Sequence, residues 1–551
     1  MSITVALRLC LTSLLLLAQH AWAGTAAVAM PDRYAAQASS QVLREGGNAV
    51  DAAITAVFVL AVTFPDAGNI GGGGFMVSHM GAEDAFLDFR ERAPQQAQRD
   101  MYLDEGGNFV QRNSLVGGKA SGVPGTVRGM LAAHTRYGSK PWAELLQPAI
   151  TLARNGFVVH PEQAGYAAEK VIEVAGNGNF ARYFAAMRGG EIFKQAELAA
   201  TLERIAADPQ EFYTGLTARR IVAQMKASDG LITLQDLAEY RAVWRTPLRH
   251  NWREYTVVTA PPPSSGGIAL LQLLKMRDYA SDHFRDVWHN SPQYIHLLAE
   301  IEKRVFADRA EYLGDPDFVD VPVASLLDEG YLKRRAGEIN PEKISLASAV
   351  TPGLESPDTT HFSILDKHGN AVALSYTLNW DFGSGVVVEG AGFVMNNEMD
   401  DFSAKVGVKN KFGLVGNARN AIEPGKRMLS SMTPTLLLED GEPVFVGGTQ
   451  GGSTIFTSLY QVILNLYDYG MPLQAAVDAN RYHHQLPDAR LIRHDQRDIP
   501  DPTRRSLTAL GYTVEPNSWG NLGDMQVIRV EGDEVQSASD NRGRGVAVLI
   551  N

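Results

Sequence analysis

The spacing of apolar residues divides the chain into a mixed first part and a strand-rich last part. Helical spacing predicts four helices before residue 340: Ala49–Val62, Trp142–Asn155, Leu198–Ala207 and Ile268–Leu274. Alternation predicts strands there at Phe75–His79 and Tyr255–Thr259. After residue 358 come three hairpin-like runs (TTHFSILD/AVALSYTLN, GVVVEGAGFVMN and MTPTLLLEDGEPVFVGG), a helical stretch over Thr457–Tyr469 and a strand over Met525–Val530. Strands in both parts with helices outside them indicate a layered α/β sandwich.

The first of these hairpins has a register that can be read from its turn. If Lys367–Gly369 forms a three-residue turn with Gly369 in the left-handed conformation, Asp366 pairs with Asn370 and Thr359 lies opposite Thr377. Directly opposed residues share a face. One face is then polar: Thr359, His361, Ser363, Ser375, Thr377 and Asn379. The other is a core face: Phe362, Ile364, Val372, Leu374 and Leu378.

The position of Thr359 at the open end of this hairpin raises a chemical question. A β-branched residue at a strand start is usually only a strand residue. A threonine hydroxyl can, however, act as a nucleophile when the free α-amino group beside it serves as its base, and an α-amine titrates near about 7.7–8. This chemistry requires a cut after Asp358. The preceding segment, Ile339–Asp358, has three prolines and no clear apolar period, which predicts an exposed, mobile segment that could accommodate a cut.

Composition and the N-terminus narrow the class of protein. The 551 residues are 45% hydrophobic and 20% charged, as in soluble globular proteins, and the net charge of −12 without a basic block argues against nucleic acid as a partner. Arg8, the apolar run Leu9–Leu17 and the sequence Ala21-Trp22-Ala23 predict a signal peptide over residues 1–23, hence a periplasmic or secreted protein. No other apolar run is long enough for a membrane span in the mature chain.

The only cysteine, Cys10, lies inside that signal. The mature chain would therefore have no disulfide, no thiolate nucleophile and no cysteine-ligated metal. His483-His484 lacks the spacing of a zinc site and is interpreted as structural, and Asp400-Asp401 lacks convergent metal ligands. No G-x-S-x-G nucleophile elbow is present.

An ordered series of sequence blocks resembles the γ-glutamyltransferase (glutathione hydrolase) family of N-terminal nucleophile hydrolases. The blocks cover nearly all of the mature chain: NAVDAAITAVFVLAV, NIGGGGFM, DFRERAP, SGVPGTV, PPPSSGG, DTTHFSILDKHGNAV, YTLN, NNEMDDFS, LSSMTPT, QGGS and RYHHQ. The resemblance implies a four-layer αββα sandwich and autocatalytic cleavage before Thr359. A large subunit (residues 24–358) and a small subunit (residues 359–551) would then form a heterodimer.

The resemblance also implies roles for individual residues. Thr359 would attack the γ-carbonyl of glutathione or another γ-glutamyl amide, and water, an amino acid or a dipeptide would resolve the acyl-enzyme. Thr377 would hydrogen-bond the nucleophile, and Gly451 and Gly452 would form the oxyanion hole. The substrate α-carboxylate would be bound by Arg90, Ser430 and Ser431, and its α-ammonium by Asn379, Glu398 and Asp401. No cofactor and no metal are implied.

Five positions depart from the pattern of that family: Asp358, Trp380, Asp381, Phe412 and Gln450. They leave the glutamyl head-group residues intact and put the leaving-group and acceptor side in question. One alternative is therefore a cephalosporin (glutaryl-type) acylase with the same machinery. Another, from a different class, is an exported protein that binds amino acids or peptides without catalysis.

Overall fold

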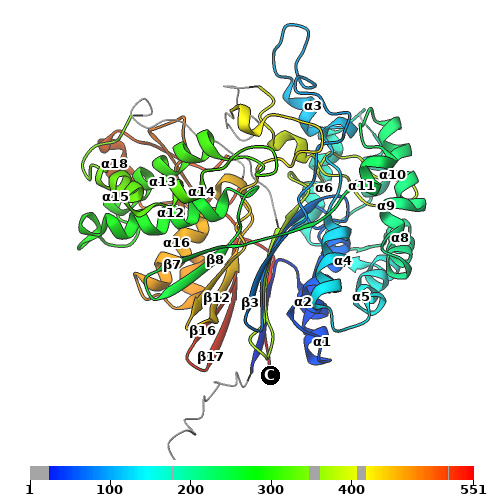
Figure 1. Ribbon diagram of the computed structural model, residues 1–551, viewed down its shortest axis with the longest axis horizontal. Coiled ribbons are helices and arrows are strands. Elements are labelled where there is room, and N and C mark those ends of the chain that lie inside the picture. The colour runs from blue at the N-terminus through cyan, green and yellow to red at the C-terminus, as the bar shows by residue number, and fades with distance from the viewer. Residues whose placement is uncertain (1–23, 177, 347–359, 406–416, 519) are drawn as a thin grey trace, which may run out of the picture.

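Two antiparallel sheets face each other at the centre of the molecule (Figure 1). This computed structural model describes residues 24–176, 178–346, 360–405, 417–518 and 520–551. The seven-stranded sheet has the order β18 (Val546–Ile550), β1 (Ala26–Met30), β9 (Thr360–Leu365), β10 (Ala371–Thr377), β2 (Gly73–Met80), β3 (Glu83–Asp88) and β6 (Val243–Arg245). The six-stranded sheet has the order β17 (Glu534–Ser539), β16 (Gln526–Glu531), β12 (Glu442–Gly448), β11 (Thr435–Glu439), β8 (Tyr255–Thr259) and β7 (Leu248–Trp252).

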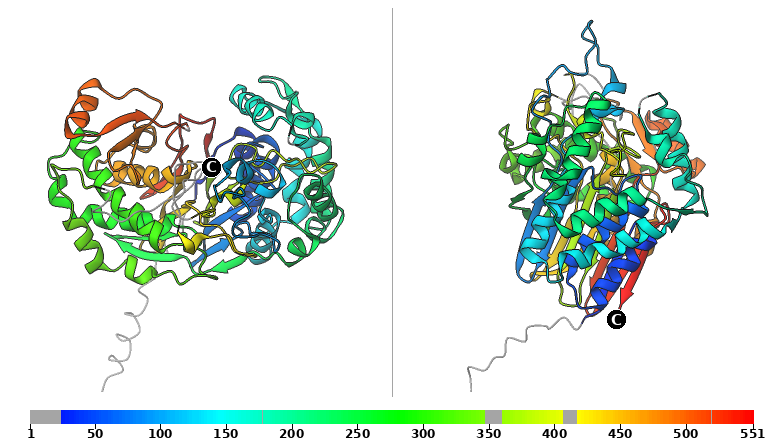
Figure 2. Two further views of the ribbon diagram at one scale, coloured as in Figure 1. Left: turned by 90° about the horizontal axis from the view of Figure 1, so that it is seen from above. Right: turned by 90° about the vertical axis from the view of Figure 1, so that its right-hand side faces the viewer.

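Helices cover the outer face of each sheet (Figures 1 and 2). Beside the seven-stranded sheet lie α1 (Arg33–Arg44), α2 (Ala49–Thr63), α4 (Thr126–Tyr137), α5 (Trp142–Asn155), α6 (Pro161–Glu173), α8 (Ala196–Ala207) and α10 (Leu216–Ala227). Beside the six-stranded sheet lie α12 (Gly266–Tyr279), α13 (Pro292–Tyr312), α15 (Glu329–Gly337), α16 (Ile455–Tyr467) and α18 (Asp501–Leu510). The predicted four-layer αββα sandwich is confirmed.

Three apolar cores separate these four layers. One lies between α1–α10 and the seven-stranded sheet, a second between the two sheets, and a third between the six-stranded sheet and α12–α18. The middle core contains small and medium side chains such as Ala29, Val77 and Val446. Both sheets are therefore buried on both faces.

The hairpin β9–β10 has the register predicted from its turn. Thr360 pairs with Tyr376 and Leu365 with Ala371, Gly369 has φ +80°, and the N–H of Asp366 donates to the carbonyl of Asn370 (2.9 Å). The polar face does not meet water, because it packs against the second sheet. His361 is buried there, and burial lowers its pKa to about 3, so that the neutral ring shares a hydrogen bond with Ser375 (2.8 Å).

One of the predicted hairpins is shorter than expected. The run GVVVEGAGFVMN turns back on itself, but its pairing is limited to an isolated antiparallel bridge between Val387 and Val394. Gly385, Gly390 and Gly392 all have positive φ in this stretch, which interrupts the extended conformation despite its apolar residues. The predicted segment Ile339–Asp358 lies outside the described residues from residue 347 onward, and the predicted signal peptide lies wholly outside them.

Strands from both sides of the predicted cut alternate in the seven-stranded sheet. β9 and β10, which follow residue 359, lie between β1 and β2, which precede it. β18, near the C-terminus, closes the sheet beside β1. A chain cut between residues 358 and 359 would therefore keep its two parts joined by three strand pairs in this sheet, β18–β1, β1–β9 and β10–β2. A fourth pair, β11–β8, joins them in the six-stranded sheet.

The glycine run NIGGGGF allows β2 to approach β10 closely. A Cβ on Gly72 would lie 2.0 Å from the carbonyl oxygen of Thr377, and one on Gly74 would lie 2.3 Å from that of Ser375. These are backbone atoms of a buried strand, so they cannot move away as a flexible side chain could.

We expect Gly72→Ala to cost about 1–3 kcal/mol of stability, because the new methyl group overpacks the end of β10. The matched control is Gly165→Ala in α6, where a Cβ would meet nothing within 4 Å and alanine is the better helix former. Urea denaturation followed by circular dichroism measures both variants. Equal midpoints for the two variants would contradict the close-approach argument.

Candidate active site

The end of β10 forms the first part of the site. Thr377 is buried, and its Oγ1 accepts a hydrogen bond from the N–H of Asn379 (2.7 Å). Asn379 has φ +81°, an unusual conformation for a residue with a side chain, and its Nδ2 donates to the carbonyl of Asn397 (3.0 Å). Thr359, the predicted nucleophile, lies outside the described residues. Thr360, directly after it, pairs with Tyr376, so Thr377 is the next position along β10.

Two asparagines of the NNEMDD block join several loops at this end of the strand. The Asn396 amide donates to the carbonyls of Gly71 (2.7 Å) and Gly122 (2.9 Å) and accepts from the N–H of Glu398 (3.1 Å). The N–H of Asn397 donates to the carbonyl of Leu378 (2.9 Å). The separate sequence blocks NIGGGGFM, SGVPGTV, YTLN and NNEMDD thus meet at one place.

Arg90 lies at the centre of a buried ion cluster. It follows β3, where the Asp88 carboxylate accepts from its N–H (3.0 Å), and its side chain is 1% exposed. Nη1 lies 2.6 Å from Glu398, and Nη2 donates to Asp401. Glu91, which was not among the predicted site residues, lies 3.8 Å from the same guanidinium.

Three carboxylates therefore surround one guanidinium. Burial raises the pKa of Glu91 to about 8 in spite of the nearby Arg90, and burial also raises the pKa of Glu398 well above its ordinary value. The pKa of Arg90 is raised by Glu398 and Asp401, which outweigh the opposing effect of its burial. A second buried arginine, Arg309, also interacts electrostatically with Asp401. The three carboxylates still outnumber these two cations, and a further cation would stabilise their ionised form.

The two serines of the LSSM block lie next to this cluster. Arg90 donates to the carbonyl of Leu429 (3.4 Å), directly before Ser430. The loop is held from the other side by Ser265, whose N–H and Oγ both donate to the Ser430 carbonyl (2.7 Å each). Ser430 and Ser431 are both buried. The structure thus gathers Arg90, Glu398, Asp401 and the LSSM loop.

Gly451 and Gly452 lie at the N-terminal end of α16, in the short 3-10 turn that leads into it. Both have positive φ (123° and 57°), and a Cβ on Gly451 would lie 2.6 Å from Thr454 Oγ1. Among the described residues neither N–H has a hydrogen-bond acceptor. Two free N–H groups at a helix N-terminus can stabilise a developing negative charge.

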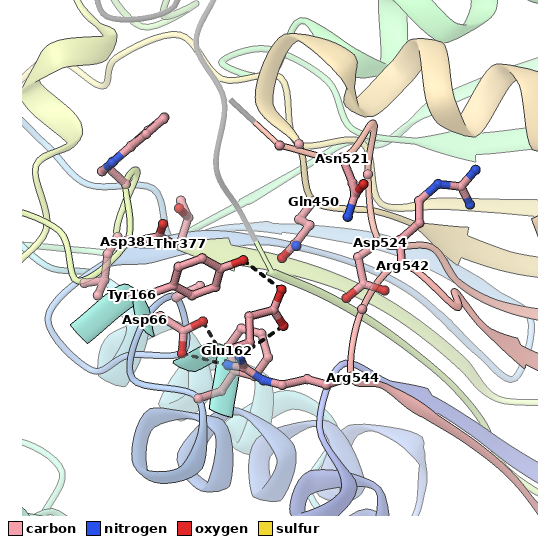
Figure 3. Close-up of a pocket in the computed structure, with 18 of the residues that line it drawn as sticks. Asp66, Glu162, Tyr166, Thr377, Asp381, Gln450, Asn521, Asp524, Arg542 and Arg544 are labelled. Atoms are coloured by element: carbon pink, nitrogen blue, oxygen red, sulfur yellow. Dashed lines mark hydrogen bonds and ion pairs between the residues drawn. The ribbon is translucent and has the colours of Figure 1, made fainter. Parts of the chain in front are cut away.

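A pocket of about 330 Å³ opens beside Thr377 and Gly451 (Figure 3). It is rich in acidic side chains, and its charged lining residues are Asp66, Glu162, Glu169, Asp381, Asp524, Arg542 and Arg544. Trp380, Asp381 and Gln450, three of the positions that depart from the family pattern, also line it. The other two, Asp358 and Phe412, lie outside the described residues.

The histidine pair lies inside the protein and is hydrogen-bonded there. His483 and His484 are both buried, and burial lowers their pKa values to about 4 and about 3. His483 shares a hydrogen bond with Thr457 (2.9 Å), and His484 with the carbonyl of Leu491 (2.8 Å). Within the described ranges, no group of three His, Cys, Asp or Glu residues is arranged to hold a metal ion, and no helix is both long and apolar enough to cross a bilayer.

Comparison with known proteins gives consistent matches over almost the whole chain. Residues 35–550 match the model of the family Gamma-glutamyltranspeptidase. A glutathione hydrolase proenzyme of Pseudomonas aeruginosa is 56% identical over 526 residues, which are 95% of this chain and 94% of that protein. A cephalosporin acylase from Bacillus halodurans has a similar structure, with a TM-score of 0.84, 28% identity and 96% of each chain covered. A chain of the gamma-glutamyltranspeptidase from Pseudomonas nitroreducens, solved in complex with L-DON, is 53% identical with a TM-score of 0.58; 97% of that chain matches 59% of this one.

The Arg90 cluster leads to a prediction about stability. Arg90→Ala should lower the free energy of unfolding by about 3–5 kcal/mol, because it leaves Glu398 and Asp401 buried without their cation. Arg182→Ala is the control, since Arg182 pairs with Glu389 but both side chains are 59% exposed, and an exposed pair contributes at most about 1 kcal/mol. Equal losses in chemical denaturation would show that the Arg90 pairs contribute no more than a surface pair.

Proposed function

This chain belongs to the gamma-glutamyltranspeptidase family, and on that premise we propose that it is an exported enzyme that hydrolyses and transfers γ-glutamyl groups. Its donors are glutathione and other γ-glutamyl amides, and its acceptors are water, amino acids or dipeptides. The group is carried between them as an ester on Thr359. Cleavage before Thr359 divides the precursor into subunits 24–358 and 359–551, which stay together as a heterodimer.

The observation that carries this proposal is the excess of acid around Arg90. A glutamyl head group has one carboxylate and one ammonium at a fixed separation. Its α-carboxylate would bind the Arg90 guanidinium and the Ser430 and Ser431 hydroxyls, and its α-ammonium would bind Glu398, Asp401 and the Asn379 side chain. The head group adds one negative and one positive charge, so its ammonium would pair with the surplus acids while its carboxylate binds the arginine, and the net charge of the cluster would not change.

The reaction then needs only groups at the end of β10 and the start of α16. The free α-amine of Thr359 takes the proton from its own hydroxyl while the oxygen attacks the γ-carbonyl carbon. The N–H groups of Gly451 and Gly452 stabilise the tetrahedral oxyanion. The proton passes to the departing amine, the C–N bond breaks, and the γ-glutamyl ester remains. Water or an acceptor amine reverses these steps, and Thr377 holds the nucleophile by a hydrogen bond.

The glutaryl-type acylase is the second candidate, and the similarity to a cephalosporin acylase structure favours it. A glutaryl group has no ammonium, so it would leave the surplus acids of the Arg90 cluster without a cation. Glu91, Glu398 and Asp401 together therefore favour the γ-glutamyl substrate. An exported binding protein without catalysis would require the chain to remain uncut.

Maturation tests the nucleophile. Purified protein should contain two chains, and mass analysis should find that the smaller one begins at Thr359. Thr359→Ala should remain one uncut chain, because the attacking hydroxyl is missing. Thr360→Val is the matched control and should still be cut, because Thr360 Oγ1 is buried without a hydrogen-bond partner among the described residues. A small chain that begins elsewhere would overturn the proposed mechanism.

Head-group selectivity tests the substrate class. Asp401→Asn should lower kcat/KM for γ-glutamyl anilide by a factor of roughly 30 or more, in line with about 2–5 kcal/mol for a buried charged contact, and should change glutaryl anilide hydrolysis little. Asp400→Asn is the adjacent control, because Asp400 accepts from Ser114 instead of Arg90. If Asp401→Asn reduces both activities equally, the residue has a structural role and the γ-glutamyl assignment loses its main support.

A further inference from the structure

The charged residues that line the pocket in Figure 3 have no role in the chemistry described so far. It includes Thr377, Asn379 and Gly451, so it reaches the reacting centre. None of the residues around the head group that carry charge, Arg90, Glu398 and Asp401, contributes to its lining. The pocket is therefore a second space that opens on the same end of β10.

We propose that this pocket receives the donor's leaving group and the incoming acceptor, and that Asp381 makes it selective for groups with a positive charge. The inference rests on the proposed function, because it assigns the other half of the same substrate. A γ-glutamyl amide extends from its carbonyl carbon in two directions. The glutamyl end would bind to the Arg90 cluster. The amine end would then lie in the pocket beside Thr377 and Gly451.

Both arginines that line the pocket already form ion pairs with carboxylates of the protein. Arg544 binds both oxygens of Asp66 (2.8 and 2.9 Å), and Arg542 binds Asp495 (2.6 Å) and Asp540 (2.9 Å). Figure 3 shows Asp66 and Glu162 turned toward Arg544, away from Asp381. An anionic ligand would have to displace one of these pairs to reach a cation.

Asp381, in contrast to the two arginines, forms no ion pair with a described residue. Among the described residues it has neither a hydrogen bond nor an ion pair, and it lines the pocket beside Trp380. Burial and the nearby negative charges of Asp66 and Glu169 raise its pKa to about 7, and the opposing charges of Lys170 and Arg544 do not compensate for them. The pKa of Asp524, across the pocket, is also raised by burial and by Asp540. A cation in the pocket would relieve both effects, and an indole ring next to it suits the same ligand.

The sequence departures support this assignment. Trp380, Asp381 and Gln450 come from two distant segments of the chain, yet all three line this pocket. Of the residues that match the family pattern, Arg90, Glu398 and Asp401 form the head-group cluster, and Thr377, Asn379 and Gly451 lie where the two spaces meet. The differences particular to this chain thus concentrate where the leaving group would lie. Glutathione's leaving group ends in a carboxylate, so donors with basic leaving groups should rank above it.

The test uses three donors that share the γ-glutamyl head and differ in the leaving group: the amides of lysine, norleucine and glutamate. We expect the mature enzyme to hydrolyse the lysine donor with a kcat/KM at least about fivefold above that of the norleucine donor, and the glutamate donor more slowly than either. Asp381→Asn should bring the lysine and norleucine donors within twofold of each other and leave the norleucine value unchanged within twofold. Asp381→Glu should keep the preference.

Asp440→Asn is the matched control, because Asp440 lies in the exposed turn between β11 and β12. If Asp381→Asn does not mature, the wild-type enzyme is assayed at low and at high salt instead. The ratio of kcat/KM for the lysine donor to that for the norleucine donor should fall at high salt, because salt screens an attraction between charges. A wild-type enzyme without the preference, or one that keeps it in Asp381→Asn, would overturn the inference alone. A chain that hydrolyses none of the donors, γ-glutamyl anilide included, would overturn the proposed function.

Discussion

The pairing of β9 and β10 between β1 and β2 is the constraint on which the rest of the structure depends. These two central strands come from one side of the predicted cut and their neighbours from the other, so each side completes the sheet of the other. Separating the two parts would expose unpaired strand edges and the apolar cores on both faces of the sheet. The chain must therefore fold as one polypeptide before any cut, and the cut parts should remain associated afterwards. The same pairing places Thr360, the residue directly after the predicted N-terminus, opposite Tyr376 of β10.

The Arg90 cluster and the pocket beside Thr377 both contain acidic side chains that the cations of the protein do not fully neutralise. Around Arg90, three carboxylates outnumber its guanidinium and that of the nearby buried Arg309. In the adjoining pocket, Asp381 has no hydrogen-bond or ion-pair partner among the described residues, while both arginines are paired. Buried acids in excess of bases are costly unless a ligand supplies the missing positive charge. The first region fits an α-ammonium, and the second fits a cation carried by the leaving group. Binding would thus stabilise groups that the free protein holds at raised pKa values.

The parts of the fold that the sequence could predict are those fixed by local rules. The β9–β10 register follows from one turn with a left-handed Gly369, and α5 has the predicted bounds Trp142–Asn155 because its apolar stripe is regular. The longest helix, α13, was not predicted, since it buries charged residues such as Glu300 and Lys303 among its apolar ones and so lacks a clear periodicity. The hairpin around Val387 is shorter than predicted, because glycines with positive φ limit its pairing to one antiparallel bridge although most of its residues are apolar.

Some residues of the site could likewise be predicted from the sequence, and others could not. Roles for Arg90, Glu398 and Asp401 came from the family resemblance, and the structure adds that they contact one another. Glu91 was overlooked although it stands next to Arg90 in the DFRERAP block. The pocket could not be predicted at all, because Asp66, Asp381 and Arg544 come from three distant segments and meet only through the tertiary fold.

The central claim is that a γ-glutamyl group is carried on the hydroxyl of Thr359, and trapping that intermediate tests it most directly. Mature protein would be mixed with γ-glutamyl anilide, quenched in acid within the first turnover and analysed by mass spectrometry of its separated chains. We expect one added γ-glutamyl group on the smaller chain, located in its N-terminal peptide. Turnover of the anilide with the added group on another residue, or with none on either chain, would contradict it.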